Sequence, residues 1–264
     1  WLNWGNLALS LLFAAGALYA GVKVPVVKNV HIPSERLARE YTVVVLSDLH
    51  IHRVINPQKI ERIVSLANAR NPDVVLLAGD IIDDDVRRVS KITALLKGLK
   101  ASKGIYFVTG NHEFYAGYDE TVRELANLGF MFLENDGAAV GEDLYLAGVP
   151  DTFAGAAYGK TPDLNRAFAK AGKGAFRLLV SHTPSDFAGR DFDLEVSGHT
   201  HGGQIFPFPI FAKLHNKYLS GLYPMPGGAE IYVSNGAGQW GPQMRFLAPS
   251  EITVLKLTPE KQEK

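Results

Sequence analysis

Runs of apolar residues alternate with amphipathic stretches through the first half of the chain. The runs YTVVVLS, DVVLLAG and GIYFVTG are rich in β-branched residues and are bounded by polar residues or glycine, which is typical of buried strands. The expected strands cover residues 41–47, 73–79 and 104–110, and the expected helices cover 57–70, 84–99 and 118–128. This β-α-β-α order predicts parallel strands in a layered α/β domain.

The second half of the chain is richer in strands. Strands are predicted over 144–149, 176–181, 193–198, 230–235 and 251–257, with one helix near 163–171. Residues 202–228 contain four prolines and five glycines, which predicts a long surface excursion. Its segment 205–223 is strongly aromatic, and two interpretations are open: it packs on the domain, or it contacts lipid or acyl chains as an exposed apolar patch can.

The first 22 residues carry no charged side chain. Their length is close to the ~20 apolar residues that cross a bilayer, and Trp1, Trp4 and Tyr19 suit the interfaces of a membrane. A signal peptide and a buried core helix are the alternatives. We expect an anchor over 1–22, a linker over 23–40 and the main domain over 41–264. Basic residues just after the anchor favour a cytoplasmic main domain, with a secreted or cell-surface location as the alternative.

Composition excludes several kinds of site. Lysine plus arginine and aspartate plus glutamate number 27 each, so no overall basic field points to a nucleic-acid partner. The chain has no cysteine, which excludes disulfides, thiolate metal sites and a cysteine nucleophile. Composition leaves the oligomeric state open.

Polar residues collect where the expected strands end. They form the segments Asp48-Leu49-His50, Gly79-Asp80, Asn111-His112-Glu113, His182 and His199-Thr200-His201. The step from Asp48 to Asp80 is 32 residues and that from Asp80 to Asn111 is 31, about one βαβ unit each, which places these strand ends side by side. Six of the eight histidines lie in or beside these segments. Any one of them alone would be interpreted as structural, but the set predicts a metal site.

The ordered motifs DLH, GDIID, GNHE, SH and GHTH, which span residues 48 to 201, resemble those of the calcineurin-like metallophosphoesterase superfamily. Three later stretches, GGQI, SGLYPMPGG and GAGQWGPQMR, resemble its small, membrane-anchored, bacterial-type branch. The resemblance implies a four-layer αββα sandwich with two metal ions at the strand ends. Arg-Gly would follow GDxxD in Ser/Thr protein phosphatases, whereas Asp84-Asp85 stand here, so protein phosphatase activity is not expected.

The resemblance also implies a role for each residue of the motifs. One metal would be held by Asp48, His50, Asp80 and His201, and the other by Asp80, Asn111, His182 and His199, with Asp80 bridging. His112 would act as the general acid toward the leaving group, and Asp83 would orient it. The nitrogen-rich ligand set favours Mn, Fe, Zn or Co over Ca²⁺.

These assignments predict a dinuclear metal-dependent phosphoesterase that attacks phosphodiester or diphosphate bonds with a hydroxide held between two cations. The membrane anchor favours a lipid-linked or nucleotide-lipid phosphate as substrate. The alternatives are a broad-specificity phosphodiesterase acting on soluble nucleotides and a non-catalytic scaffold, which would lack ligands that are all present here. Arg245 is a candidate phosphate or headgroup contact by its charge alone.

Overall fold

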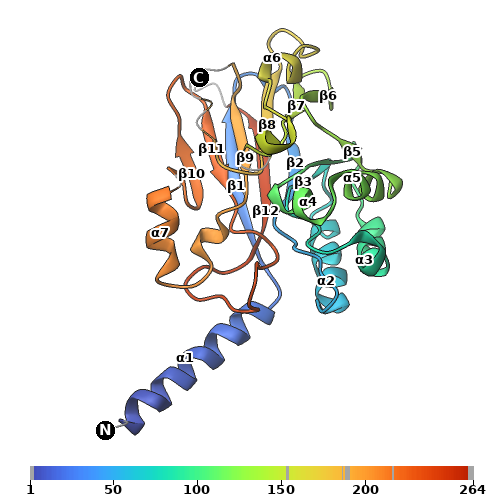
Figure 1. Cartoon of the computed structure of the whole chain (residues 1–264). Helices are drawn as coiled ribbons and strands as arrows, with labels where there is room; N and C mark the ends of the chain where they lie inside the picture. The colour runs from blue at the N-terminus through green and yellow to red at the C-terminus, as the bar shows by residue number, and fades with distance from the viewer. Residues whose placement is uncertain (1–2, 153–154, 186, 188–190, 216, 261–264) are drawn as a thin grey trace.

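Two mixed β-sheets packed face to face form the centre of the molecule (Figure 1). The computed structural model describes residues 3–152, 155–185, 187, 191–215 and 217–260. The first sheet contains, in spatial order, β1 (Val26–Ser34), β12 (Glu251–Pro259), β2 (Tyr41–Leu46), β3 (Val74–Ala78), β4 (Ile105–Val108) and β5 (Met131–Phe132). The second contains β10 (Gly221–Pro224), β11 (Glu230–Val233), β9 (Leu194–Ser197), β8 (Phe176–Val180), β7 (Leu144–Gly148) and β6 (Asp136–Ala139).

Helices lie outside both sheets. They are α2 (Pro57–Asn68), α3 (Val86–Thr93), α4 (Asn111–Ala116) and α5 (Tyr118–Asn127) beside the first sheet, α6 (Leu164–Ala167) and α7 (Phe208–His215) on the side of the second, and the N-terminal α1 (Trp4–Val22). The helix expected over 84–99 begins after its N-cap Asp85 and continues from Thr93 as a 3-10 turn, η1 (Ala94–Gly98). Asp85 fits this position because its carboxylate accepts the backbone N–H of Arg87.

Side chains along each strand alternate between two apolar layers. On β2, Val43 and Val45 lie between the sheets, in one cluster with Leu178 of β8. Val44 and Leu46 point the opposite way and pack in the cluster that includes residues of α2, α3 and α5. A third cluster covers the outer face of the second sheet. The expected αββα sandwich is therefore confirmed.

Parallel pairing brings several strand ends to one edge. In the first sheet, β2, β3 and β4 are parallel neighbours, and in the second sheet β7, β8, β9 and β11 are. Polar groups that follow these strands therefore meet at the carboxyl edge of the sandwich.

The range 23–40, expected to be a linker, contains strand β1. This strand pairs in parallel with β12 at the edge of the first sheet. It was not predicted because an edge strand needs no continuous apolar run: only Ile32 among its residues is buried, and Pro33 is tolerated where one side of the strand has no partner. The first sheet therefore begins before residue 41.

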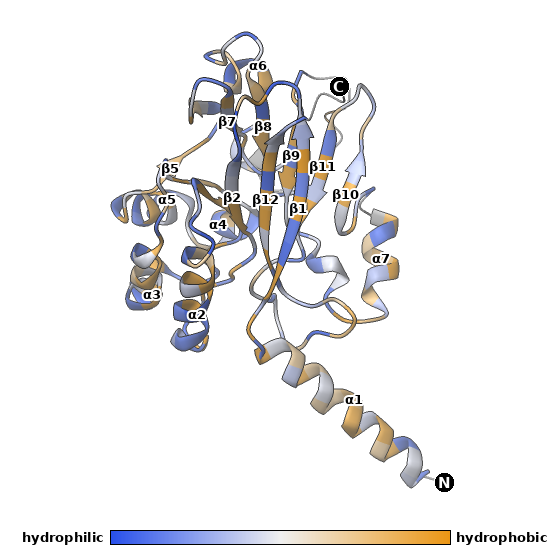
Figure 2. Cartoon of the chain, turned by 180° about the vertical axis from the view of Figure 1, so that it is seen from behind, coloured by the Kyte–Doolittle hydropathy of each residue, from blue (hydrophilic) through white to orange (hydrophobic). Residues whose placement is uncertain are grey.

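Helix α1 projects from the body of the molecule (Figures 1 and 2). Among the described residues it is the one helix long and apolar enough to cross a membrane, and little of it is buried. Its middle and C-terminal part contact the body: the Phe13 ring packs on Phe246, the Ala17 carbonyl accepts the backbone N–H of Arg245 at 2.9 Å, and the Gly21 carbonyl accepts a hydrogen bond from Lys59 Nζ at 3.0 Å. The N-terminal apolar helix is thus present, and the end nearer the body is firmly attached.

The excursion over 202–228 contains regular structure that was not predicted, namely η3 (His201–Gly203), α7 and β10. Four prolines obscured these elements in the sequence. Tyr218 and Tyr223 pack in the cluster on the outer face of the second sheet, so this part of the aromatic segment 205–223 packs on the sandwich, as one interpretation held. Ile210 and Leu214 of α7 are exposed, so that interpretation does not hold for this side of α7.

Candidate metal centre

The proposed ligands stand on unusual backbone at the strand ends. Asp48 and His50 follow β2, Asp80 follows β3, and His199 and His201 follow β9. All five have positive φ, between 47° and 67°. Side chains seldom adopt this left-handed region, Asp and His more readily than most, and such backbone collects at functional sites. The local conformation turns these side chains inward rather than along the strand.

The first group of side chains comprises Asp48, His50 and His201. Asp48 Oδ1 lies 3.3 Å from His201 Nε2, and the two Nε2 atoms of His50 and His201 are 2.9 Å apart. The backbone N–H of His199 also donates to Asp48 Oδ1 at 3.0 Å, which ties the ends of β2 and β9 together across the two sheets. Candidate ligand atoms of the three residues all lie within 4.8 Å of one another.

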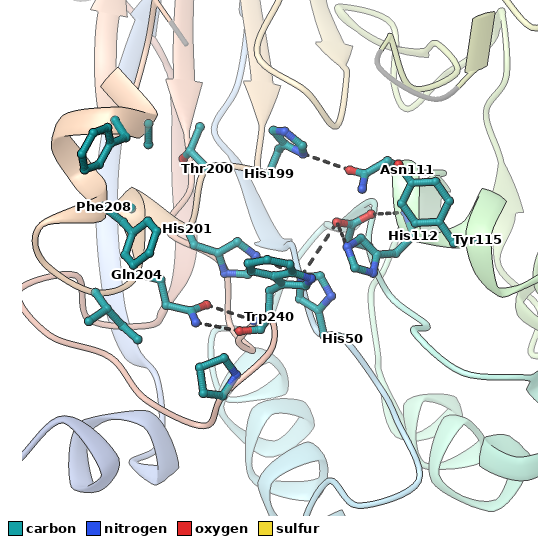
Figure 3. A pocket seen from close by; sticks show the side chains of 16 residues that line it. His50, Asn111, His112, Tyr115, His199, Thr200, His201, Gln204, Phe208 and Trp240 are labelled. Atoms are coloured by element: carbon teal, nitrogen blue, oxygen red, sulfur yellow. Dashed lines mark hydrogen bonds and ion pairs between the residues drawn. The ribbon is translucent and has the colours of Figure 1, made fainter. Parts of the chain in front are cut away.

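The second group comprises Asp80, His182 and His199, with Asn111 beside them. Asp80 Oδ2 is 3.1 Å from His182 Nε2. His199 Nδ1 is 3.0 Å from Asn111 Oδ1, as Figure 3 shows. Asp80 also connects the two groups, because its Oδ2 is 3.8 Å from His50 Nε2. The structure thus brings together all seven side chains expected to bind metal; that they are the ligands stays a prediction.

The imidazole orientations fit a pair of cations. Asp83 Oδ1 is 2.7 Å from His50 Nδ1, and the Ala78 carbonyl is 2.8 Å from His182 Nδ1. An imidazole that donates a hydrogen bond through Nδ1 has its lone pair on Nε2, and here Nε2 faces the site. Hydrogen-bond acceptors at Nδ1 orient metal-binding histidines in this way. With Nδ1 donating to Ala78, the buried Nε2 of His182 is an acceptor that faces Asp80 Oδ2, another acceptor, so neither satisfies the other and a cation between them would satisfy both. These buried His and Asp clusters are consistent with a dimetal site.

His112 lies at the open side of the centre, at the start of α4 (Figure 3). Its Nδ1 is 2.9 Å from Asp83 Oδ1, and its Nε2 is 3.9 Å from Asp80 Oδ2. Burial alone would lower the pKa of His112, but the hydrogen bond to Asp83 and the charges of Asp80 and Asp83 outweigh it, so this pKa lies above its ordinary value. His112 can therefore hold a proton near neutral pH.

The charges of the centre favour ionised carboxylates. Burial would raise the pKa of Asp80, but His182, His50 and His112 around it hold that pKa well below its ordinary value. Burial likewise opposes the ionisation of Asp83, and hydrogen bonds from His112 and His50 overcome it, so the pKa of Asp83 is lowered. Both groups are thus anionic at neutral pH.

Glu113 supports the centre and was not among the predicted site residues. Its buried carboxylate accepts four backbone N–H groups, those of Asp80 (3.0 Å), Ile81 (2.6 Å), Ile82 (3.0 Å) and Gly110 (2.6 Å). It therefore joins the loop after β3 to the loop after β4. The signal was available, because Glu113 is the last letter of GNHE, but its contacts depend on tertiary structure.

Gly110 is needed because the two loops approach closely. A Cβ atom at this position would lie 2.2 Å from Asp80 Oδ1 and 2.7 Å from His182 Cδ2. No side chain fits there without displacing a proposed ligand. The glycine of GNHE therefore keeps room for the centre.

Arg245, a candidate phosphate or headgroup contact by its charge, is buried and is not among the residues that line the cavity beside the centre. Its side chain is 0% exposed and donates to backbone carbonyl oxygens of the surrounding loops, those of His201, Asn235, Gly236, Gly238 and Ala248. Burial lowers the pKa of Arg245 to about 10, so it stays protonated at neutral pH. Arg245 instead fixes the loop that carries His201.

A cavity of about 860 Å³ opens beside the centre (Figure 3). His50, Asp80, Asn111, His112, His199 and His201 form its polar part. Its remaining wall is largely apolar and includes Ile205, Phe208, Phe211, Ala212, Trp240 and Pro242. Gln204 holds the two sides of this wall together, since its side-chain amide donates to the Trp240 carbonyl at 2.7 Å and accepts the Trp240 N–H at 2.9 Å.

Proteins of known sequence resemble this chain over most of its length. An uncharacterized metallophosphoesterase of Helicobacter pylori is 37% identical over 248 residues, which cover 92% of this chain and 67% of the relative. A transmembrane protein with metallophosphoesterase domain from Danio rerio is 34% identical over 268 residues, which cover 95% of this chain and 61% of that protein. The chain thus spans about two thirds of the length of these relatives.

Solved structures share the fold. A dimetal phosphatase from Danio rerio matches with a TM-score of 0.51 and 13% identity, over 83% of this chain and 98% of that chain. A 5'-nucleotidase precursor from Thermus thermophilus matches with a TM-score of 0.51 and 16% identity, over 83% and 54% of the two chains. The family model for calcineurin-like phosphoesterases matches residues 41–203, the range that holds both groups of the centre. This chain therefore belongs to the calcineurin-like phosphoesterase family.

Proposed function

We propose that this protein is a membrane-anchored, dinuclear metal-dependent phosphoesterase that hydrolyses a phosphodiester or diphosphate bond of a lipid-linked substrate. The observation that carries the proposal is one cavity in which the His and Asp centre meets an apolar wall. The polar part suits a phosphate group, and the apolar part suits a hydrocarbon.

Bound divalent cations would supply Lewis acidity toward the phosphate oxygens and the attacking water. The chain's own residues do the rest. Asp48 and Asp80 are the two carboxylates among the seven proposed ligands, so two divalent cations would leave net positive charge facing a phosphate anion. His112, held through Nδ1 by Asp83, directs Nε2 toward the departing oxygen and gives it a proton as the P–O bond breaks.

Asp83→Asn should move the alkaline limb of the pH–rate profile to lower pH. The rate falls as pH rises through the pKa of His112, because only the protonated imidazole can give up a proton. Since the charge of Asp83 raises the pKa of His112, removal of this charge should shift the alkaline limb by about one unit toward lower pH. The limb is measured from kcat/KM between pH 5 and 10 with saturating Mn²⁺.

The neighbouring variant Asp84→Asn is the matched control, since Asp84 faces Arg53 (3.4 Å) and Arg88 (4.0 Å) rather than the centre. Metal content is measured in parallel, because Asp83 also holds His50. A limb that stays in place in Asp83→Asn at full metal content would show that Asp83 does not set the pKa of the proton donor.

The lipid-linked class is supported by the position of the cavity. Phe208 and Phe211 of α7 and Trp240 form its wall, and these large apolar side chains are also partly open to solvent. An alkyl or acyl chain laid against them would remove apolar surface from water, whereas a free nucleotide would leave most of it exposed. The α1 helix would keep the enzyme beside such substrates.

Phe211→Ser should therefore separate the two substrate classes. Loss of the ring should lower kcat/KM for a detergent-solubilised nucleotide-lipid diphosphate about tenfold, the equivalent of ~1.4 kcal/mol of lost apolar burial, and leave a model aryl phosphodiester nearly unaffected. Val54→Ser, an exposed apolar residue outside the cavity, is the control. Equal losses on both substrates, or faster turnover of soluble nucleotides than of the lipid by the unaltered enzyme, would favour the soluble-nucleotide alternative.

A further inference from the structure

Exposed apolar side chains gather on one side of the molecule, on α7, just before α7 and on the loop 240–247. We call this surface the apolar rim; it comprises Phe206, Phe208, Ile210, Phe211, Leu214, Trp240 and Leu247. Leu214 and Leu247 are 78% and 75% exposed, and Trp240 is 57% exposed. Isolated exposed apolar residues are ordinary on soluble proteins, but a contiguous group of this kind marks a surface that meets a partner or a membrane.

The apolar rim is continuous with the attachment of α1. Ile205, just before α7, forms backbone bridges with Phe246 and Leu247, and the Phe246 N–H donates to the Gln204 carbonyl at 2.8 Å. The Phe246 ring in turn contacts Phe13 of α1, with centroids 4.2 Å apart. The segment leading into α7, the loop 240–247 and α1 are therefore linked by direct contacts.

The two faces of α7 have different surroundings. Phe208, Phe211 and Ala212 border the cavity, whereas Ile210 and Leu214, one helical turn apart, do not. Ile210 and Leu214 thus form an outer apolar face of α7, which is exposed and does not line the cavity. Lys213 between them is exposed as well, and a lysine beside apolar residues is typical of helices that lie in the headgroup region of a bilayer.

The position of α7 relative to α1 favours a lipid surface over a protein partner. Both views show α7 on the same side of the body as α1, near the end of α1 that joins the body (Figures 1 and 2). A membrane crossed by α1 therefore begins close to α7. The contacts of Phe13 and Ala17 with residues 245 and 246 fix α1 next to the apolar rim, so the anchor brings this side of the molecule to the bilayer.

We propose that α7 is a second membrane contact, with Ile210 and Leu214 inserted among the lipids of the bilayer that α1 crosses. The cavity, bordered by the opposite face of α7, would then open at the membrane surface. This inference rests on the membrane anchoring by α1 proposed above, but it does not depend on the proposed reaction.

The absence of cysteine in the chain allows a direct test with a single introduced thiol. Leu214→Cys in the full chain is labelled with an environment-sensitive fluorophore and reconstituted into vesicles of phosphatidylcholine and phosphatidylglycerol. We expect a blue-shifted emission and at least twofold quenching when brominated lipids replace ordinary ones. Lys91→Cys is the matched control, because this variant has the same α1 helix and Lys91 is exposed on α3, beside the other sheet. A label at position 91 should show neither the blue shift nor the quenching.

Two outcomes would overturn the proposal. A label at 214 as solvent-exposed and unquenched as the label at 91 would show that α7 stays in water. A label at 214 that is shielded but unaffected by brominated lipids would show that a second copy of the chain covers the apolar rim. Ile210→Lys in the labelled Leu214→Cys chain should reduce the quenching toward the control value, with α1 still in the bilayer. Undiminished quenching in that variant would contradict insertion of this face.

Discussion

Asp80→Asn is expected to remove metal from both positions of the centre at once. Asp80 Oδ2 lies 3.1 Å from His182 Nε2 in one group and 3.8 Å from His50 Nε2 in the other, so its carboxylate is the group common to both. The amide is neutral and offers one oxygen, which can neither bridge two cations nor offset their charge. Metal content, measured after loading with Mn²⁺ and gel filtration, should fall from about two ions per chain to below one.

Turnover should fall with the metal, by at least about 100-fold, since loss of a group that only supports a ligand already costs up to that much at metal sites. The matched control is Asp85→Asn, the same change five residues away. It leaves the centre untouched, and asparagine also serves as the N-cap of α3. Full metal occupancy in Asp80→Asn would refute the bridging role, and loss of one ion alone would place Asp80 in a single position.

The buried strands and the strand-end chemistry could be predicted because their signals are local. A parallel strand covered on both faces is a continuous apolar run, as in YTVVVLS, and the polar residue that follows it is the one at the sheet edge. Asp48, Asp80 and His199 were therefore found from their place in the sequence, and the structure brings them together.

Elements and roles that depend on tertiary contacts were not accessible in the same way. The edge strand β1 and helix α7 are partly exposed and interrupted by proline, so neither shows a clear period. An arginine is usually exposed, and nothing near Arg245 in the sequence shows that five carbonyl oxygens converge on it. Glu113 likewise acts through backbone groups of residues 80–82, which are distant in sequence.

His112→Ala is expected to keep both metal ions and lose most turnover on substrates with poor leaving groups. His112 sits at the open side of the centre, and its Nδ1 is held by Asp83 rather than pointing to the proposed ligands. A positioned general acid contributes about 10²–10⁴-fold, so loss of the imidazole should lower kcat by that amount for an alkyl phosphodiester. An activated aryl ester, whose leaving group departs without a proton, should be affected far less.

This difference between substrates distinguishes a proton donor from a ligand. Removal of a metal ligand should lower the metal content and slow the hydrolysis of all esters alike, as expected for Asp80→Asn. His31→Ala, an exposed histidine on β1 far from the centre in the sheet, is the control for the substitution itself. If His112→Ala lost metal, the group formed by His50, Asp80 and His112 would be a ligand set instead. If alkyl and aryl esters lost the same factor at full metal content, the proton would have to come from elsewhere, because only a step that protonates the leaving group discriminates between them.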